Sequence, residues 1–395
     1  MGIFSKSLSK PNPLASSPSR RRPVEQRSGR SIPLGRLASG PVVEIPLARL
    51  SQHLVVTGSP GMGKTTLTAG LARRLSQEGL AVVVLEPAKS EYRWLLPSSS
   101  TVYGAAGQPG VTELKTNPFY VDAGVRIGAW IEDLTAAIAD SYGAAQEATG
   151  PLYLEALVRR LYRACSIREH EPAGQDGRWP TVKTFLDQID GFMAMECCSG
   201  PEVTGNIRGF LARRGRSMAA CPALLCKEGL SFDDIISHGT TSILQLSDFG
   251  RGSARFLGMI MLLRVISSAR ILGNRPLHTV VVLEEAHSLF VDELSGEPTM
   301  FARLYEAALA ELRAAGIGFV TVDQRPSLLP AGVMANSVSK VAFASTSGDD
   351  RNVIERALGL DEAQTRRFGG LSEGEALFST AGIQGAEVIR ADSRR

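Results

Sequence analysis

A glycine-rich segment between an apolar strand and a helix constrains the fold of this chain more than any other feature. Residues 57–66 read TGSPGMGKTT and directly follow the apolar run Leu-Val-Val at 54–56. They match every fixed position of the pattern G-x-x-x-x-G-K-[ST]. Helical periodicity then covers 65–78, Gly79 is a typical helix stop, and a second apolar strand follows at 81–85. This order of elements predicts an α/β fold with a parallel sheet that is covered on both faces.

The glycine-rich segment has the composition of a loop that binds nucleotide phosphates. Glycine tolerates positive φ and carries no Cβ, so several backbone N–H groups can turn towards one anion. The following helix adds the positive end of its dipole. We expect Lys64 to contact the β- and γ-phosphates of ATP, and the Thr65 hydroxyl to complete the shell of a bound Mg²⁺. The predicted nucleotide-binding residues are Gly58, Ser59, Pro60, Gly61, Met62, Gly63, Lys64, Thr65 and Thr66.

Two adjacent acids follow a third apolar strand. Residues 280–283 read VVVL and lead into Glu284 and Glu285. Ligands of open α/β sheets bind at the carboxyl ends of the strands, and adjacent residues there point to different sides. We expect Glu284 to support Mg²⁺, and Glu285 to act as the general base that polarises the attacking water.

Two further candidates flank the strand predicted at 317–322. Gln324 follows this strand, and its amide can both donate and accept, which suits a residue that senses the γ-phosphate or helps to orient water. A polar turn before Pro326 is the alternative. Arg313 precedes the strand and is a candidate to stabilise transferred charge in a neighbouring subunit through its planar guanidinium. For Arg313 the alternative is a plain surface position on a helix.

Strand and helix patterns divide the chain into segments. A short hairpin is expected from residue 31, and helical periodicity replaces strand patterns over 123–235. Strands are predicted again at 242–246, 279–283, 317–322, 340–344 and 376–379, with helices at 256–271 and 301–315. We therefore predict one core built from two parts, 31–122 and 236–395, with a helical insertion over 123–235.

The positive charge of the chain is concentrated in a tail over residues 1–30. This tail has seven Lys and Arg residues and one Glu, a net +6, while the whole chain has +3, so the remaining residues carry a net −3. The tail is rich in Ser and Pro and poor in apolar residues, which predicts disorder. Basic arms of this kind either hold nucleic acid electrostatically or are merely solvated ends.

Other features argue against a membrane protein and against a cysteine-based metal site. The longest apolar stretch, 256–266, is interrupted by Arg264, and the first residues carry neither a secretion nor a lipidation signal. We expect a cytoplasmic protein without membrane insertion. The five cysteines lack the paired spacing of a zinc site, so no metal ligand is assigned among them. His53, His278 and His287 are expected to be satisfied core or edge histidines.

These motifs, in this order, resemble the HerA, FtsK and VirB4 group of RecA-like motor ATPases, and most closely its HerA (DUF87) branch. The resemblance spans about 32–379. It includes LGR followed by IPLARLSQHLVVTGSPGMGKT, then VVLEPAKSEYRWL, NPF at 117–119, LEEAH and DQRPS. It implies a mostly parallel RecA-like P-loop NTPase sheet of the ASCE class, with ATP and Mg²⁺. It further implies a homohexameric ring that threads or unwinds double-stranded DNA, working with a nuclease or another effector in DNA processing or phage defence.

Carried over to this sequence, the resemblance assigns Lys64 and Thr65 to the nucleotide loop, Glu285 to the catalytic glutamate, Gln324 to the sensor and Arg313 to a trans-acting arginine. Three departures are evident. Glu284 stands where the group usually has Asp, the stretch VAFASTSGDDR lacks a His-Arg pair, and about 50 residues before the loop are too few for a β-barrel.

Two alternatives to a HerA-type translocase stay open. One is a conjugation or secretion coupling ATPase, against which the lack of a membrane span weighs. The other is a nucleotide-switched scaffold for a defence effector with little turnover, for which the Glu284 departure leaves room.

Basic residues outside the tail are candidates for contacts with DNA phosphates, which a translocase needs for sequence-independent binding. One cluster lies in NIRGFLARRGR, where a solvated helix face is the alternative. The other lies in EPAKSEYR, where packing or a subunit contact near nucleotide is equally expected. The candidates are Arg208, Arg213, Arg214, Arg216, Lys89 and Arg93.

Overall fold

The structure is a computed structural model, and it describes most of the chain. The described residues are 29–142, 149–174, 178–196, 200–236, 239–292, 296, 298–382 and 385–391. The basic tail predicted over 1–30 therefore falls almost entirely outside them, and so do Cys197 and Cys198.

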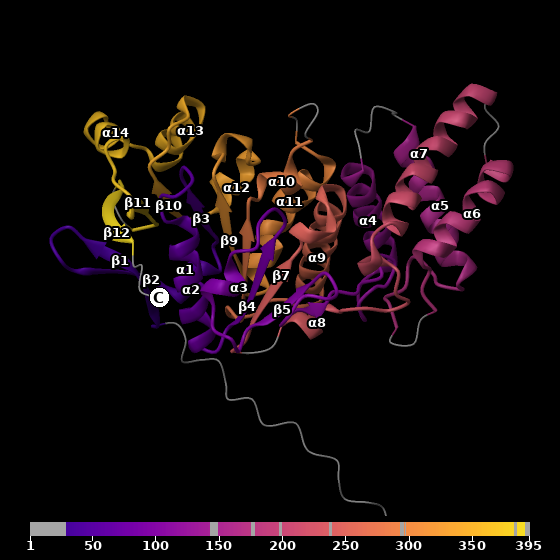
Figure 1. Cartoon of the computed structure of the whole chain (residues 1–395), viewed down its shortest axis with the longest axis horizontal. Coiled ribbons are helices and arrows are strands. Elements are labelled where there is room, and N and C mark those ends of the chain that lie inside the picture. Colours follow the sequence, from indigo (N-terminus) through magenta and orange to yellow (C-terminus); the bar gives the residue numbers. More distant parts are fainter. Residues whose placement is uncertain are drawn as a thin grey trace, which may run out of the picture.

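A single mixed sheet organises the molecule (Figure 1). Its strands are β1 (Ser31–Leu37), β2 (Val42–Pro46), β3 (Leu54–Thr57), β4 (Ala81–Glu86), β5 (Thr101–Gly104), β6 (Thr112–Glu113), β7 (Thr241–Gln245), β8 (Thr279–Glu284), β9 (Ile317–Asp323), β10 (Ser339–Phe343), β11 (Glu375–Ser379) and β12 (Glu387–Ala391). The strand order is β2-β1-β12-β11-β10-β3-β9-β8-β4-β7-β5-β6. From β10 to β6 neighbouring strands are parallel. From β2 to β10 they are antiparallel.

Helices cover this sheet and extend beyond one end of it. They are α1 (Leu47–Leu50), α2 (Lys64–Gln77), α3 (Tyr92–Leu95), α4 (Ile127–Ser141), α5 (Gly150–Ala164), α6 (Val182–Glu196), α7 (Pro201–Ala219), α8 (Phe232–Ile235), α9 (Arg251–Leu272), α10 (His287–Phe290), α11 (Met300–Ala314), α12 (Ala331–Asn336), α13 (Gly348–Leu358) and α14 (Glu362–Gly369). Within the described part of the chain, no helix is both long and apolar enough to span a bilayer.

The central strands are apolar throughout because both of their faces are covered. Along β4, Val82 and Val84 belong to the cluster that contains the apolar face of α2, whereas Val83 and Leu85 belong to the cluster that contains α4, α9 and α11. Alternate residues of a strand point to opposite faces, so the two clusters are the two sides of the sheet. The α/β fold with a mostly parallel sheet, predicted from continuous apolar strands, is confirmed.

Every predicted strand is present with its ends shifted by at most one or two residues. The hairpin expected from residue 31 is β1 and β2. The strands β5, β6 and β12 were not predicted. They are short, and β6 consists of two exposed residues at the sheet edge, so neither alternation nor an apolar run marks it.

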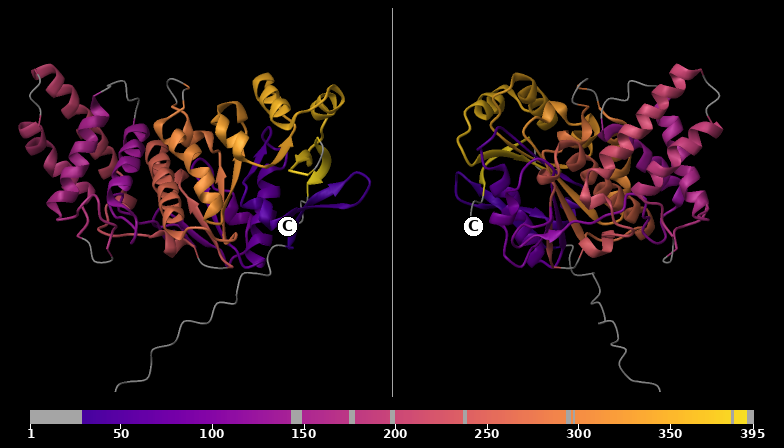
Figure 2. Two further views of the ribbon diagram at one scale, coloured as in Figure 1. Left: turned by 180° about the vertical axis from the view of Figure 1, so that it is seen from behind. Right: turned by 45° about the vertical axis from the view of Figure 1, so that its right-hand side comes forward.

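The segment 123–235 is helical, as its periodicity predicts. Figures 1 and 2 show α5, α6 and α7 standing together at one end of the molecule, while the β1–β2 hairpin lies at the other end. Helix α4, in contrast, packs against α9 and α11 beside the sheet. One hydrophobic cluster continues from the sheet through α4 and α9 into α5, α6 and α7. The division of the chain at 123 and 235 therefore stays a prediction.

Candidate nucleotide-binding and hydrolysis site

The glycine-rich loop connects β3 to α2, and its glycines adopt backbone conformations that other residues avoid. Gly58 has φ 140° and Gly63 has φ 109°. A Cβ on Gly58 would lie 2.6 Å from the Cβ of Phe343 on β10, so this position also requires the absence of a side chain. The loop is fixed from outside, because Ser59 donates its backbone N–H to the Ala344 carbonyl oxygen at 2.8 Å.

Lys64, the first residue of α2, lies folded over this loop. Its ammonium donates to the carbonyl oxygens of Gly58 at 2.7 Å and Ser59 at 2.9 Å, and the residue is 6% exposed. Burial lowers the pKa of Lys64, and the nearby Glu284 carboxylate counteracts part of this effect. A phosphate bound in the loop would stabilise the charged form of this buried ammonium more strongly than Glu284 does.

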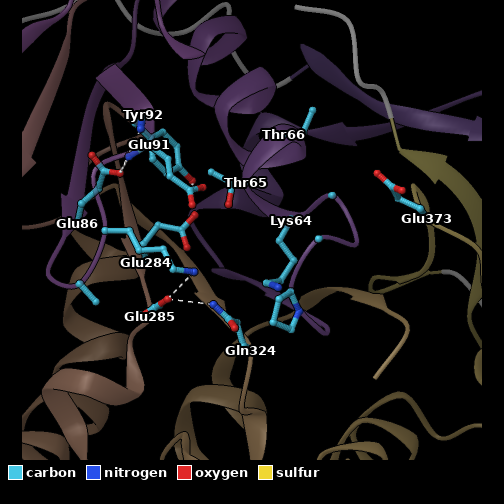
Figure 3. A pocket seen from close by; sticks show the side chains of 15 residues that line it. Lys64, Thr65, Thr66, Glu86, Glu91, Tyr92, Glu284, Glu285, Gln324 and Glu373 are labelled. Atoms are coloured by element: carbon cyan, nitrogen blue, oxygen red, sulfur yellow. Dashed lines mark hydrogen bonds and ion pairs between the residues drawn. The ribbon is translucent and has the colours of Figure 1, made fainter. Parts of the chain in front are cut away.

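Glu284 ends β8 and is held by a buried tyrosine. The Tyr92 hydroxyl donates to Glu284 Oε1 at 2.6 Å and lies 2.5 Å from the Thr68 hydroxyl on α2. Burial raises the pKa of Glu284 to about 7, although the Tyr92 hydrogen bond and the Lys64 charge both favour the ionised form. A cation bound beside this carboxyl group would favour the ionised form further. Figure 3 shows Thr65 and Glu284 directed towards the same part of the cavity.

Glu285 follows Glu284 and turns its side chain towards β9. Its φ is 44°, a left-handed conformation that a non-glycine residue rarely adopts and that recurs at functional sites. Its Oε1 accepts hydrogen bonds from the Lys89 ammonium at 2.8 Å and from the Gln324 amide at 2.9 Å, and both contacts are dashed in Figure 3. The structure thus brings Glu285 and Gln324 into direct contact, although 39 residues separate them in the sequence.

These groups surround one cavity of about 260 Å³ at the carboxyl ends of β4, β8 and β9. Of the residues singled out in the sequence, its lining includes Pro60, Gly61, Gly63, Lys64, Thr65, Thr66, Glu284, Glu285 and Gln324. Gly58 and Ser59 act through their carbonyl oxygens on Lys64, and Met62 accepts a hydrogen bond from the Gly374 N–H at 3.1 Å. These residues therefore lie at or beside one cavity, and their individual roles remain predictions.

Arg313 does not reach this cavity in its own chain. It is exposed in the last turn of α11, which precedes the amino end of β9, whereas Gln324 follows the carboxyl end of the same strand. The two residues therefore lie at opposite ends of β9. A role for Arg313 in the site of a neighbouring subunit stays a prediction.

Five charged or hydroxyl-bearing residues of the cavity were missed as site residues. They are Glu86, Lys89, Glu91, Tyr92 and Glu373. Glu86 ends the apolar strand β4, and Lys89, Glu91 and Tyr92 follow it, and this position was the available signal. Glu86 accepts hydrogen bonds from the backbone N–H groups of Glu91 at 2.7 Å and Tyr92 at 3.1 Å, and burial raises its pKa to about 7. Lys89, which was considered for a DNA contact, is part of this cavity.

The side-chain oxygen atoms at this cavity fit a nucleotide that is bound together with Mg²⁺. The described residues contain no cluster of three or more His, Cys, Asp or Glu side chains suited to hold a metal by themselves. Mg²⁺ needs no such cluster, because it usually keeps several waters and binds one or two protein oxygens together with substrate phosphates. Glu284 and the Thr65 hydroxyl are the side chains that would hold it here.

Two of the other sequence expectations have clear outcomes. The expectation that Arg214 contacts DNA is wrong, because this residue is 1% exposed, stacks on the Phe210 ring at 3.5 Å and donates to the Ala139 carbonyl oxygen at 3.0 Å. The histidines are satisfied, as expected. His53 and His278 bond backbone carbonyl oxygens, and His287 bonds the Asp323 carboxylate at 3.0 Å.

Comparison with known proteins agrees with this geometry. Residues 32–130 match the family model described as the central domain of the helicase HerA. VirB4 of Thermoanaerobacter pseudethanolicus matches with a TM-score of 0.71 and 19% sequence identity, over 92% of this chain and 96% of that chain. The predicted resemblance to the HerA, FtsK and VirB4 group is confirmed.

A second solved structure is similar in fold to this chain. The bacterial conjugative coupling protein TrwB matches with a TM-score of 0.64 and 15% identity, over 93% of this chain and 90% of that chain. TrwB has also been solved in complex with ADP and Mg²⁺. Among curated proteins, none matches this sequence significantly.

Proposed function

We propose that this chain is an ATP-hydrolysing, ring-forming DNA translocase or helicase of the HerA type. The observation that carries the proposal is the convergence of Lys64, Glu284, Glu285 and Gln324 on one cavity beside the glycine-rich loop. A nucleotide loop alone would support binding only. A general base and a hydrogen-bonding amide at the same cavity support hydrolysis.

In this proposal each side chain has a distinct task. Lys64 would compensate the charge of the β- and γ-phosphates, and Thr65 and Glu284 would hold Mg²⁺, which would supply further positive charge for phosphoryl transfer. Glu285 accepts a proton from the attacking water, and Gln324, already hydrogen-bonded to Glu285, orients that water. Arg313 would act in the site of the neighbouring subunit of a homohexamer.

Duplex DNA is the proposed substrate of the motor. Arg208, Arg213 and Arg216 line an open groove of about 840 Å³ between α6 and α7, and all three are exposed. Arg208 is bonded to Asp190 across this groove. Such residues suit sequence-independent contacts with phosphates. A cytoplasmic location and a nuclease or defence effector as partner also remain part of the proposal.

The test is an ATPase assay on the purified chain with Mg²⁺, in the presence and absence of duplex DNA. We expect turnover that DNA stimulates and that falls at least about 100-fold in Lys64→Ala and Glu285→Gln. Lys183→Met, at an exposed position on α6, is the control and should keep wild-type turnover. Robust hydrolysis by Glu285→Gln would remove Glu285 as the general base. An ordered ring with negligible turnover in the wild type would favour the scaffold alternative.

A coupling ATPase of conjugation or secretion is the second candidate. It is favoured by the match to VirB4 and TrwB over more than nine-tenths of this chain. Both candidates hydrolyse ATP, so turnover does not separate them. Displacement of a DNA-bound block or separation of strands by the isolated protein favours the HerA-type motor, whereas DNA-stimulated turnover without movement along DNA favours a coupling protein that needs a partner.

A further inference from the structure

An ion pair joins the loop after β4 to the end of β8. The Lys89 ammonium lies 2.8 Å from Glu285 Oε1, and the same oxygen accepts from the Gln324 amide at 2.9 Å. A carboxylate oxygen has two lone-pair directions, so these two donors satisfy Oε1. In this state, Glu285 Oε1 is engaged with a cation and an amide.

The charges around the cavity show why a second cation matters there. Its lining has two lysines, Lys64 and Lys89, against five glutamates. The glutamates are Glu86, Glu91, Glu284, Glu285 and Glu373. A triphosphate adds further negative charge to this acidic lining, and Mg²⁺ with one lysine does not neutralise the phosphates and the glutamates together. Any cationic side chain that reaches the cavity is therefore expected to bind the nucleotide.

Lys89 is able to change partners, whereas Lys64 is fixed. The Lys64 ammonium is buried and bonded to two loop carbonyl oxygens, but the Lys89 side chain is 48% exposed and carries a flexible four-carbon stem. The backbone beyond Lys89 is held in place, because the Glu91 N–H donates to Glu86 and the Ser90 hydroxyl lies 2.6 Å from that of Ser247. A rotation of the Lys89 side chain is thus sufficient for an exchange of partners.

The two ammonium groups also act on one another. After burial and the Glu284 charge, the positive charge of Lys89 is the next contribution to the pKa of Lys64, which it lowers. The two groups therefore lie within electrostatic range across the cavity. An anion between them would be attracted by both.

We propose that Lys89 binds the γ-phosphate of ATP, and that it leaves Glu285 to do so. This inference rests on the proposed ATPase function. The terminal phosphate carries more negative charge than a carboxylate and competes for the ammonium. ATP binding then frees Glu285 Oε1 to accept a proton from water, while ADP, which lacks the γ-phosphate, leaves the Lys89–Glu285 pair intact. The ion pair to this oxygen of the general base is therefore released when the substrate is present and kept when the product is bound.

The test compares two nucleotides on four versions of the full-length chain. Calorimetry with Mg²⁺ gives the Kd of ADP and of a non-hydrolysable ATP analogue for the wild type, Lys89→Met, Lys89→Arg and the control Lys183→Met. In Lys89→Met we expect the analogue to bind about tenfold more weakly, the loss of one charge-assisted contact, and ADP to bind within about twofold of the wild type. Lys89→Arg should recover part of the analogue affinity, and Lys183→Met should match the wild type for both nucleotides.

Three results would overturn the inference. Equal weakening of both nucleotides by Lys89→Met would show a general effect on the site. Wild-type affinity for the analogue in Lys89→Met would show that Lys89 makes no γ-phosphate contact. Failure of the wild type to bind either nucleotide would remove the proposed function itself and the inference with it, so the two failures are distinguishable.

Discussion

His53 offers a quantitative test of how the strands that carry the site are held together. It precedes β3, is 2% exposed and bonds two other elements through its ring. Nδ1 accepts the Phe319 N–H of β9 at 3.1 Å, and Nε2 lies 3.0 Å from the Leu309 carbonyl oxygen of α11. These partners require a neutral ring with its proton on Nε2, because a proton on Nδ1 would face the Phe319 N–H donor.

The perturbation is His53→Asn combined with a change of pH. Asparagine tolerates the left-handed backbone here, where φ is 62°, and its side-chain oxygen can still accept from Phe319. The bond to Leu309 is lost, and its carbonyl oxygen becomes a buried acceptor without that donor. We expect the free energy of unfolding to fall by about 1–3 kcal/mol at pH 8.

The pH dependence of this difference has a definite sign. Burial, more than any other cause, lowers the pKa of folded His53 below its ordinary value of 6.5, so the unfolded chain binds the proton more tightly. The stabilisation by His53 is therefore complete above pH 6.5 and declines as the pH falls below it. At one pH unit below that value the loss approaches about 1.4 kcal/mol, and the gap between wild type and variant narrows by that amount.

The assay is urea unfolding of both proteins at pH 8 and pH 5.5, followed by circular dichroism. The test compares the free energy of unfolding of the wild type with that of the variant at each pH, because two carboxyl groups change this free energy with pH in the opposite direction to His53. Burial raises the pKa values of Glu86 and Glu284 to about 7, so these groups add stability as the pH falls below that value. They are present in both proteins and cancel. A difference that stays constant or widens between pH 8 and pH 5.5 would refute the neutral, doubly bonded His53.

Two further predictions concern stability and metal dependence. Arg264 is fully buried on α9 and bonded to Asp122 at 2.9 Å, so Arg264→Met should lower the free energy of unfolding by about 3 kcal/mol, because the partly buried Asp122 carboxylate loses its partner. Chemical denaturation measures this, with the exposed Arg213→Met as a control that should change stability by less than about 0.5 kcal/mol. Glu284→Ala should raise the Mg²⁺ concentration for half-maximal nucleotide binding at least about tenfold, and leave binding in EDTA within about threefold of wild type. Unchanged Mg²⁺ dependence in a calorimetric titration would show that Glu284 does not support the ion.

Local sequence patterns were sufficient for the strand, loop and helix that begin the core. The apolar run before Gly58, the glycines of the loop and the periodicity of α2 act within about 25 residues, so the physics that shapes them is present in the local sequence. The same is true of Glu284 and Glu285, whose position at the end of a buried strand follows from VVVL. Short edge strands such as β6 lack such a signal, because their structure depends on the neighbour with which they pair.

The tertiary structure decided which side chains meet. Neither propensity nor spacing indicates that Lys89 contacts Glu285, or that Tyr92 contacts Glu284, because each pair joins the segment after β4 to the end of β8, far away in the sequence. The burial of Arg214 could not be predicted from its residue type either, because the neighbouring arginines Arg213 and Arg216 on the same helix are exposed.

The sequence by itself thus determined that this chain builds a glycine-rich loop between a strand and a helix, and places two acids at the end of another strand. The folded chain determined that β4, β8 and β9 lie side by side, so that the residues after them share one cavity. The reason is that loop and strand formation depend on nearby residues, whereas strand order is set by long-range packing on both faces of the sheet, which no short stretch of sequence specifies.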